Sequence, residues 1–150
     1  MIISIKAFEE LSLDELHDIL QLRVAVFVLE QDCPYQDLDG KDKIAEHLIA
    51  MDGDNVLATL RILPPGVAYE EWAIGRVVVA EEARGNGLGH TVMERAIEHI
   101  AEQSEEIKDI KLSAQEHLKT YYAYHGFMQC GDGYLEDGIP HIPMTRSANQ

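Results

Sequence analysis

The amino-acid sequence predicts an α/β fold in one domain that covers residues 1–150. The chain has 150 residues, of which 46% are hydrophobic, and this length suits one domain with a substantial core. Short alternating apolar runs over the first half are typical of antiparallel strands. Residues 72–115 then give a buried strand, a helix and a second strand, which is the order of a parallel βαβ unit.

The first half is expected to contain a strand, a helix and a hairpin. Residues 2–6 alternate in polarity and predict a short strand. Residues 11–31 predict a helix, because Ser12 is a good N-cap and Glu15 completes a capping box three residues later. Residues 46–65 predict a hairpin, with a turn at DGDN and a closing pair of prolines.

The second half is expected to alternate between strands and helices. The run WAIGRVVVA predicts a buried strand because its apolar residues are nearly continuous. The expected elements are a strand at 72–80, a helix from Leu88 to Gln103, a strand at 109–115, a short helix at 116–126, and strands within 127–138 and 141–146 around a turn.

Charge and cysteine content narrow the class of partner. The formal net charge is −15, which argues against nucleic acid and against an anionic membrane surface, since both attract surplus Lys and Arg. The same charge is compatible with an amine-bearing partner. Cys33 and Cys130 lie far apart and form no disulfide framework. With no signal peptide or membrane span in view, we expect a cytoplasmic protein.

Residues 35–46 resemble a calcium-binding loop only in part. Asp37, Asp39 and Glu46 fall at liganding positions of an EF-hand, but Tyr35 occupies the first position and a strand follows instead of a helix. We therefore expect no metal site.

The stretch RGNGLG, residues 84–89, connects the valine-rich strand to the next helix. Free N–H groups at a helix N-terminus make an anion site, and glycines let the backbone approach a phosphate. A P-loop needs Lys and Ser/Thr where this chain has Gly89 and His90, and a dinucleotide fingerprint needs one residue more. An acyl-CoA loop, R-x-x-G-x-G, fits with Arg84, Gly87 and Gly89. A turn that uses glycine for geometry alone stays open as the alternative.

The order of motifs resembles the GCN5-related N-acetyltransferases, the GNAT superfamily. That order is a valine-rich strand, R-x-x-G-x-G, a helix, a strand, and a short helix that ends in Tyr-x-x-x-Gly-Phe, here Tyr122, Gly126 and Phe127. The stretches LQLRVAVFVLEQDCPYQDLDG, IGRVVVA and LEDGIPHIPM look like its ElaA subgroup. The resemblance implies a mixed, twisted sheet with helices on both faces, and acetyl-CoA wedged between two parallel strands that splay apart.

The resemblance also implies roles for particular residues. The N–H of Val79 would polarise the thioester carbonyl, and Tyr122 would be the general acid for the departing thiolate. Its phenol matches the thiol closely in ordinary pKa, although Tyr121, Tyr122 and Tyr124 could equally all be core residues. The implied cofactor-binding residues are Val77, Val78, Val79, Arg84, Gly85, Asn86, Gly87, Leu88, Gly89, Tyr122 and, in place of the family's frequent asparagine, Gln115.

The acceptor side of the site is less well defined by the sequence. Arg23, Phe27 and Glu30 follow at spacings of four and three, so we expect them on one stripe of the first helix, lining the acceptor site. A buried Arg23 needs a carboxylate, from Glu30, from the substrate, or from a structural ion pair. Candidates for the general base are Glu70, Glu71, His117 and His141, each of which also has an ordinary structural role open to it.

The function expected is an acetyl-CoA-dependent N-acetyltransferase that acts on a primary amine by direct attack in a ternary complex. The acceptor, a small molecule or a peptide amine, stays open, as does the oligomeric state, with a homodimer among the alternatives. Two other hypotheses compete: a non-catalytic acyl-CoA binding or sensing module on the same fold, and a protein that uses the loop for another nucleotide.

Overall fold

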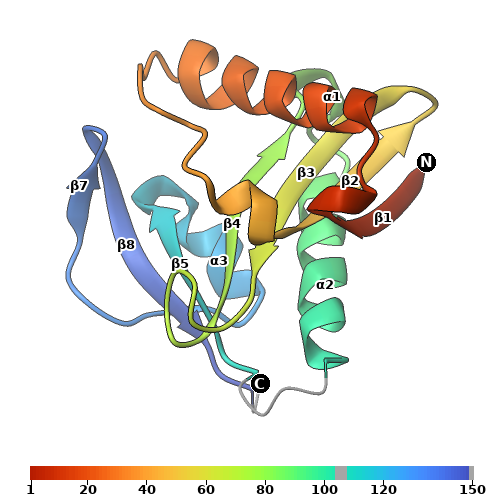
Figure 1. Ribbon diagram of the computed structural model, residues 1–150. Coiled ribbons are helices and arrows are strands. Elements are labelled where there is room, and N and C mark those ends of the chain that lie inside the picture. Colours follow the sequence, from red (N-terminus) through yellow and green to blue (C-terminus); the bar gives the residue numbers. More distant parts are fainter. Residues whose placement is uncertain (104–107, 149–150) are drawn as a thin grey trace.

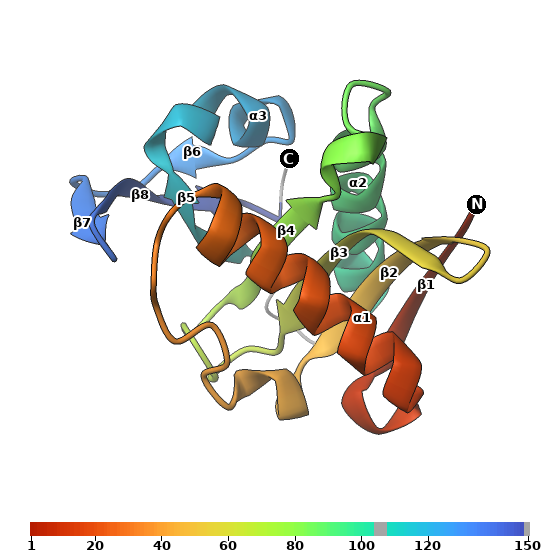
Figure 2. The ribbon, with the colours of Figure 1, turned by 90° about the horizontal axis from the view of Figure 1, so that it is seen from above.

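The computed structural model describes residues 1–103 and 108–148. Its centre is one mixed sheet in the order β1-β2-β3-β4-β5-β8-β6, with β7 paired to β8 (Figure 1). Helix α1 crosses one face of this sheet, and α2 and α3 lie on the other (Figure 2). The bounds are β1 Ile2–Ala7, α1 Leu13–Arg23, β2 Glu46–Asp52, β3 Asn55–Leu63, β4 Trp72–Val79, α2 Leu88–Ala101, β5 Ile110–Gln115, α3 Lys119–Tyr124, β6 Met128–Gln129, β7 Tyr134–Glu136 and β8 Ile139–Arg146.

The first helix starts as the sequence predicts but changes its winding before its predicted end. Ser12 accepts from the Glu15 amide at 3.0 Å and donates its own amide to the Glu15 carboxylate at 2.9 Å, which confirms the capping box. The α-helical hydrogen bonds stop at Arg23, and Val24–Glu30 forms a π-helical turn. Because this turn is wider than an α-helical one, the 3.6-residue spacing used for the sequence no longer holds beyond Arg23.

The βαβ unit has the splayed strands that the sequence implied. Strands β4 and β5 run parallel and pair only at Trp72 with Ile110 and Ala73 with Lys111, after which they separate. On its other edge β4 carries an irregular register against β3, and Arg76, inside that irregularity, has a φ of 52°. This bulge bends β4 away from β5. The gap it leaves opens at the end of β4, where the glycine loop begins.

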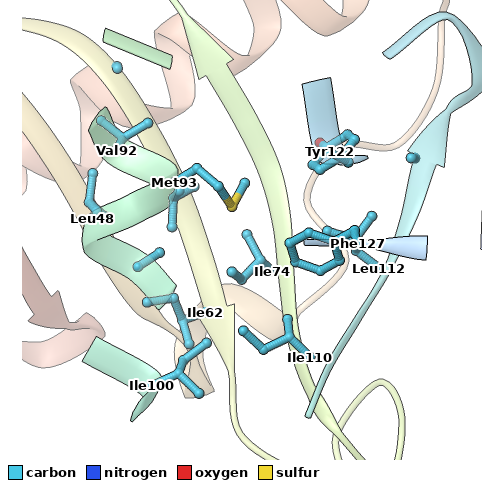
Figure 3. Close-up of a cluster of buried hydrophobic side chains, with 14 of the residues drawn as sticks. Leu48, Ile62, Ile74, Val92, Met93, Ile100, Ile110, Leu112, Tyr122 and Phe127 are labelled. Carbon is cyan, nitrogen blue, oxygen red and sulfur yellow. The ribbon is translucent and has the colours of Figure 1, made fainter. Parts of the chain in front are cut away.

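The main core lies between α2, the sheet and α3 (Figure 3). Val92, Met93 and Ile100 of α2 are almost fully buried against β-strand residues such as Leu48 and Ile62. Burial of a side chain of this size stabilises the fold by about 1.5–3 kcal/mol. The core therefore holds α2 rigidly, and with it the loop that precedes the helix.

The C-terminal strands were predicted, and their pairing explains a positive φ at a non-glycine residue. Glu136 pairs with Ile139, so Asp137 and Gly138 alone make the turn of the β7–β8 hairpin, with φ of 52° and 78°. Two successive positive φ values are those of a type I′ turn, for which Asp-Gly is a favoured pair. Strand β8 then inserts between β5 and β6. Within residues 1–103 and 108–148, no helix is both long and apolar enough to cross a membrane.

Candidate functional site

A cleft of about 1000 Å³ opens where β4 and β5 separate. Its walls come from the segment after α1, from β4, from the glycine loop, from α3 and from the β7–β8 hairpin. Of the residues expected at the site, those that line the cleft are Phe27, Glu30, Val77, Val78, Val79, Arg84, Gly85, Gly87, Gly89, Gln115 and Tyr122.

The glycine loop has the geometry of an anion site. Gly85 and Gly87 have φ of 88° and 84°, and a side chain built on either glycine would enter open space. Gly87 is the N-cap of α2, and the Leu88 amide donates to the Asn86 side chain at 3.3 Å. The amides of Gly85, Asn86, Gly87 and Gly89 find no acceptor among the residues that the structure describes. These donors, added to the positive end of the helix dipole, suit a diphosphate.

Arg84, the first residue of the loop motif, is paired with other groups of the protein. Its guanidinium donates two hydrogen bonds of 3.0 Å to the carboxylate of Glu30, and its Nε donates to the carbonyl of Val79 at 3.0 Å. The hydrogen bonds to Glu30 raise the pKa of Arg84. Glu30 therefore pairs with Arg84 and not with Arg23.

Tyr122 is buried at the base of the cleft. It is 7% exposed and packs edge-on against Phe127, with ring centroids 5.9 Å apart. Its hydroxyl makes no hydrogen bond within the described part of the chain. Burial raises the pKa of Tyr122 to about 12, so the phenol keeps its proton at neutral pH, and its pKa lies further above that of the thiol than an ordinary tyrosine's does.

The three tyrosines of α3 have different surroundings, which sequence spacing did not reveal. The Tyr121 hydroxyl donates to the carbonyl of Gly89 at 2.7 Å, so Tyr121 braces the first turn of α2. Tyr124 is 71% exposed. Among the three, Tyr122 is the most buried side chain. The alternative in which all three are equivalent packing residues is therefore wrong.

Gln115 ends β5 on the far side of the splay. Its side-chain amide donates to the Gln31 side chain at 3.2 Å. Gln31 follows the π-helical turn, so this contact joins the end of β5 to the segment after α1. Gln115 is thus placed in the cleft by a partner on the opposite wall.

Arg23 does not line the cleft. It belongs to a ring of alternating charges whose other arginines, Arg61 and Arg76, do line it. Arg23 donates to Asp37 at 2.9 Å and to Asp42 at 2.8 Å, and it is 1% exposed. Arg61 bridges Asp42 and Asp39, and Arg76 bridges Asp39 and Asp37, which closes the ring. The expectation that Arg23 lines the acceptor site beside Glu30 is therefore wrong, because the π-helical turn separates the two residues and the two aspartates satisfy its charge.

The ring fixes the segment after α1 against β3 and β4. Hydrogen bonds from Arg61 hold the pKa of Asp39 far below its usual value. Burial acts to raise the pKa of Asp42, but Arg23 and Arg61 outweigh it and the net shift is downward. Tyr35 donates to Asp37 at 2.7 Å and lies under the Arg76 guanidinium. The sequence offered one partial signal for this ring: Asp37 and Asp39, two of its three aspartates, fall in the stretch that resembled an EF-hand.

The candidates for the general base fall into two groups. Glu70 and Glu71 lie before β4 and do not line the cleft. His117 and His141 do line it. His117 is exposed, whereas His141 is 7% exposed and lies in the wall formed by β8.

Comparison with known proteins identifies the family of this chain. Residues 15–148 match a family model described as an acetyltransferase (GNAT) domain. Protein ElaA of Escherichia coli (strain K12) is 42% identical over 143 residues, which cover 94% of this chain and 93% of that protein. The crystal structure of E. coli ElaA superposes with a TM-score of 0.90 at 38% identity, over 97% of this chain and 99% of that one. The crystal structure of an acyl-CoA N-acyltransferase from Pseudomonas aeruginosa superposes with a TM-score of 0.91 at 44% sequence identity, over 98% of this chain and 100% of that one. The chain belongs to the GNAT acetyltransferase family.

Proposed function

We propose that the protein is an acetyl-CoA-dependent N-acetyltransferase that moves the acetyl group to a primary amine by direct attack in a ternary complex. The observation that carries the proposal is the set of free amides at Gly85, Asn86, Gly87 and Gly89, in a loop that lines the same cleft as the buried phenol of Tyr122. Acetyl transfer from acetyl-CoA needs a site for the diphosphate and a proton for the departing thiolate, and this cleft offers a group for each. The likeness to the P. aeruginosa acyl-CoA N-acyltransferase supports the same reading.

On the cosubstrate side of the cleft, different residues bind the diphosphate, the pantetheine arm and the thioester of an acyl-CoA. The loop amides hold the diphosphate, and the exposed edge of β4 at Val77–Val79 pairs with the pantetheine arm. The amide of Val79 donates toward the thioester carbonyl and stabilises the charge that develops there. Tyr122 gives its proton to the thiolate that leaves, and Gln115 contacts the arm from β5.

The acceptor side is formed by the segment after α1 and by the β7–β8 hairpin. Phe27 supplies an apolar surface, and Glu30 lines the cleft while it pairs with Arg84. We assign no acceptor role to Arg23. The acidic Glu136 and Asp137 also line this side, which suits an amine that arrives as a cation. The free cysteines Cys33 and Cys130 fit a reducing, cytoplasmic setting.

Two measurements test the proposal. Calorimetry with coenzyme A measures binding, and release of free thiol from acetyl-CoA, with a panel of polyamines, amino acids, aminoglycosides and peptide N-termini, measures transfer. Propionyl- and longer acyl-CoA in the same assay test the preference for acetyl. Binding with acetyl transfer to at least one amine is the expected result. Binding without transfer would establish the acyl-CoA sensing module instead.

A further inference from the structure

The β7–β8 hairpin presents one imidazole to the cleft. His141 lies opposite Gln115 in the β5–β8 register, so it stands at the end of β5 where the splay is wide. It lines the same cleft as Tyr122 and Gln115. His141 therefore lies on the β5–β8 side of the cleft.

The hydrogen bonds of His141 fix which nitrogen carries the proton. Nδ1 lies 2.7 Å from the carbonyl oxygen of Ile139. A carbonyl oxygen only accepts, so Nδ1 is the protonated nitrogen and Nε2 keeps its lone pair. The ring stacks on Tyr134 with an interplanar angle of 20°, and the Tyr134 hydroxyl is hydrogen-bonded to Ser113 of β5. Both contacts hold the imidazole plane in place.

A carboxylate faces that lone pair. Oε2 of Glu136 is 3.5 Å from Nε2 of His141. When the imidazole is neutral, the Nε2 lone pair of His141 and the Oε2 atom of Glu136 are both acceptors. A proton that Nε2 takes from a donor would therefore lie between them, beside the Glu136 carboxylate.

The hairpin turn holds Glu136 in position. The type I′ turn at Asp137 and Gly138 sets the register that places Glu136 beside His141. The thiol of Cys33 donates to the carbonyl of Asp137 at 3.4 Å, which ties the turn to the segment after α1. The pair is therefore built on a hairpin fixed at both of its ends.

We propose that His141 is the general base of the acetyl transfer and that Glu136 is its positioning residue. The assignment rests on the proposed function. Nε2 of His141 takes one proton from the acceptor ammonium. The freed amine nitrogen then bonds to the thioester carbon, the carbon–sulfur bond breaks, and the thiolate takes the Tyr122 proton. The acceptor nitrogen, now part of the amide, gives its remaining excess proton to the Tyr122 phenolate, which restores the phenol. His141 then releases to solvent the proton that it took from the ammonium.

The other candidates lack this arrangement. Glu70 and Glu71 do not line the cleft, and His117 is exposed, with no hydrogen bond to fix its ring among the described residues. The titratable groups around this part of β8 include Tyr134 and Glu136 of β7, Asp137 of the turn and His117 after β5. From other segments they include Cys33 and Tyr69. Lys111 of β5 lies toward the other end of that strand, opposite Thr145.

The test compares His141→Gln and His141→Ala with the parent, using the best amine of the panel. We expect kcat to fall by roughly 10²- to 10⁴-fold, with the calorimetric Kd for coenzyme A unchanged. The fall of kcat/KM toward acid pH should flatten, and added imidazole should restore turnover to His141→Ala in proportion to its concentration. Glu136→Gln should reduce kcat less than either His141 variant does. His17→Gln, on an exposed histidine of α1, is the matched control.

The outcomes separate this assignment from the proposed function. A parent that transfers acetyl, with His141 variants that keep the parental rate and pH profile, overturns the base and leaves the transferase intact. A loss of rate in His141→Ala that imidazole does not restore, although coenzyme A binding is intact, also overturns the base. A parent that binds coenzyme A and transfers to no amine overturns both. If the variants lose coenzyme A binding as well, proton-nitrogen NMR of the parent decides: a proton on Nε2 instead of Nδ1 overturns the base.

Discussion

The carboxylate of Glu30 accepts two hydrogen bonds from the guanidinium of Arg84, each 3.0 Å long. Glu30 closes the π-helical turn after α1, and Arg84 opens the glycine loop. The pair therefore joins the acceptor wall of the cleft to the end of β4. It also means that the charge expected to meet a phosphate is neutralised by a side chain of the protein itself.

Removal of the Glu30 charge should strengthen cosubstrate binding. In Glu30→Gln the guanidinium of Arg84 is released and a negative charge near the diphosphate is lost. We expect the calorimetric Kd for coenzyme A to fall by about twofold to tenfold, with a steeper dependence on salt. The fold should lose at most about 1 kcal/mol, because both partners are largely exposed. Glu9→Gln removes an equal charge far from the cleft and should change nothing. Weaker binding in Glu30→Gln would show that the pair orients Arg84 for the ligand.

Gly87 allows a test of the anion site that separates charge from shape. Any side chain there suffers from the φ of 84°, which Asn and Asp tolerate best. Gly87→Asn and Gly87→Asp carry nearly equal strain, and the aspartate is the better partner for the helix dipole. We therefore expect Gly87→Asp to be at least as stable as Gly87→Asn by thermal unfolding, yet to bind coenzyme A at least tenfold more weakly. Equal affinity of the two variants would show that the diphosphate lies elsewhere.

The hydroxyl of Tyr122 should matter for turnover and not for binding. Tyr122→Phe keeps the ring that packs on Phe127, so acetyl-CoA affinity should hold while kcat falls by roughly 10²- to 10⁴-fold. Because burial raises the pKa of Tyr122 to about 12, its deprotonation should cause no loss of rate below pH 10. Steady-state kinetics across pH measures both effects.

The neighbouring tyrosines serve as controls with different expectations. Tyr121→Phe removes the hydrogen bond to the Gly89 carbonyl and should weaken coenzyme A binding, with a smaller effect on kcat. Tyr124→Phe changes an exposed ring and should have no effect. If Tyr122→Phe turns over at the parental rate, the thiolate takes its proton from another source and the role implied by the family does not apply here.

The sequence predicted the parts of this molecule that depend on local patterns. The capping box at Ser12, the hairpin at residues 46–65 and the separation of β4 from β5 all follow from short motifs or from the family resemblance they carry. The partner of Arg23 could not be predicted in the same way. A single change from α to π winding moves Glu30 off the stripe, and ion pairs between distant segments leave no periodic signal. The hydrogen bond from the Tyr121 hydroxyl to the Gly89 carbonyl could not be predicted from the sequence for the same reason, since it joins α3 to α2.

The ring of arginines and aspartates should make the fold sensitive to acid. Asp39 and Asp42 have lowered pKa values in the folded state, so the unfolded chain binds more protons, and stability falls as pH drops below about 4 toward the folded values. Arg61→Met breaks the ring at a buried cation and should cost about 3–5 kcal/mol at pH 7. It should also flatten the loss of stability on the acid side, because the pKa of Asp39 returns toward its usual value. Urea unfolding from pH 7 to pH 3 measures both the loss of stability and its dependence on pH.

The control is Lys6→Met, which breaks the half-exposed pair with Glu15 and should cost less than about 1 kcal/mol. An Arg61→Met protein as stable as the parent at pH 7 would show that the ring adds nothing to the free energy of folding.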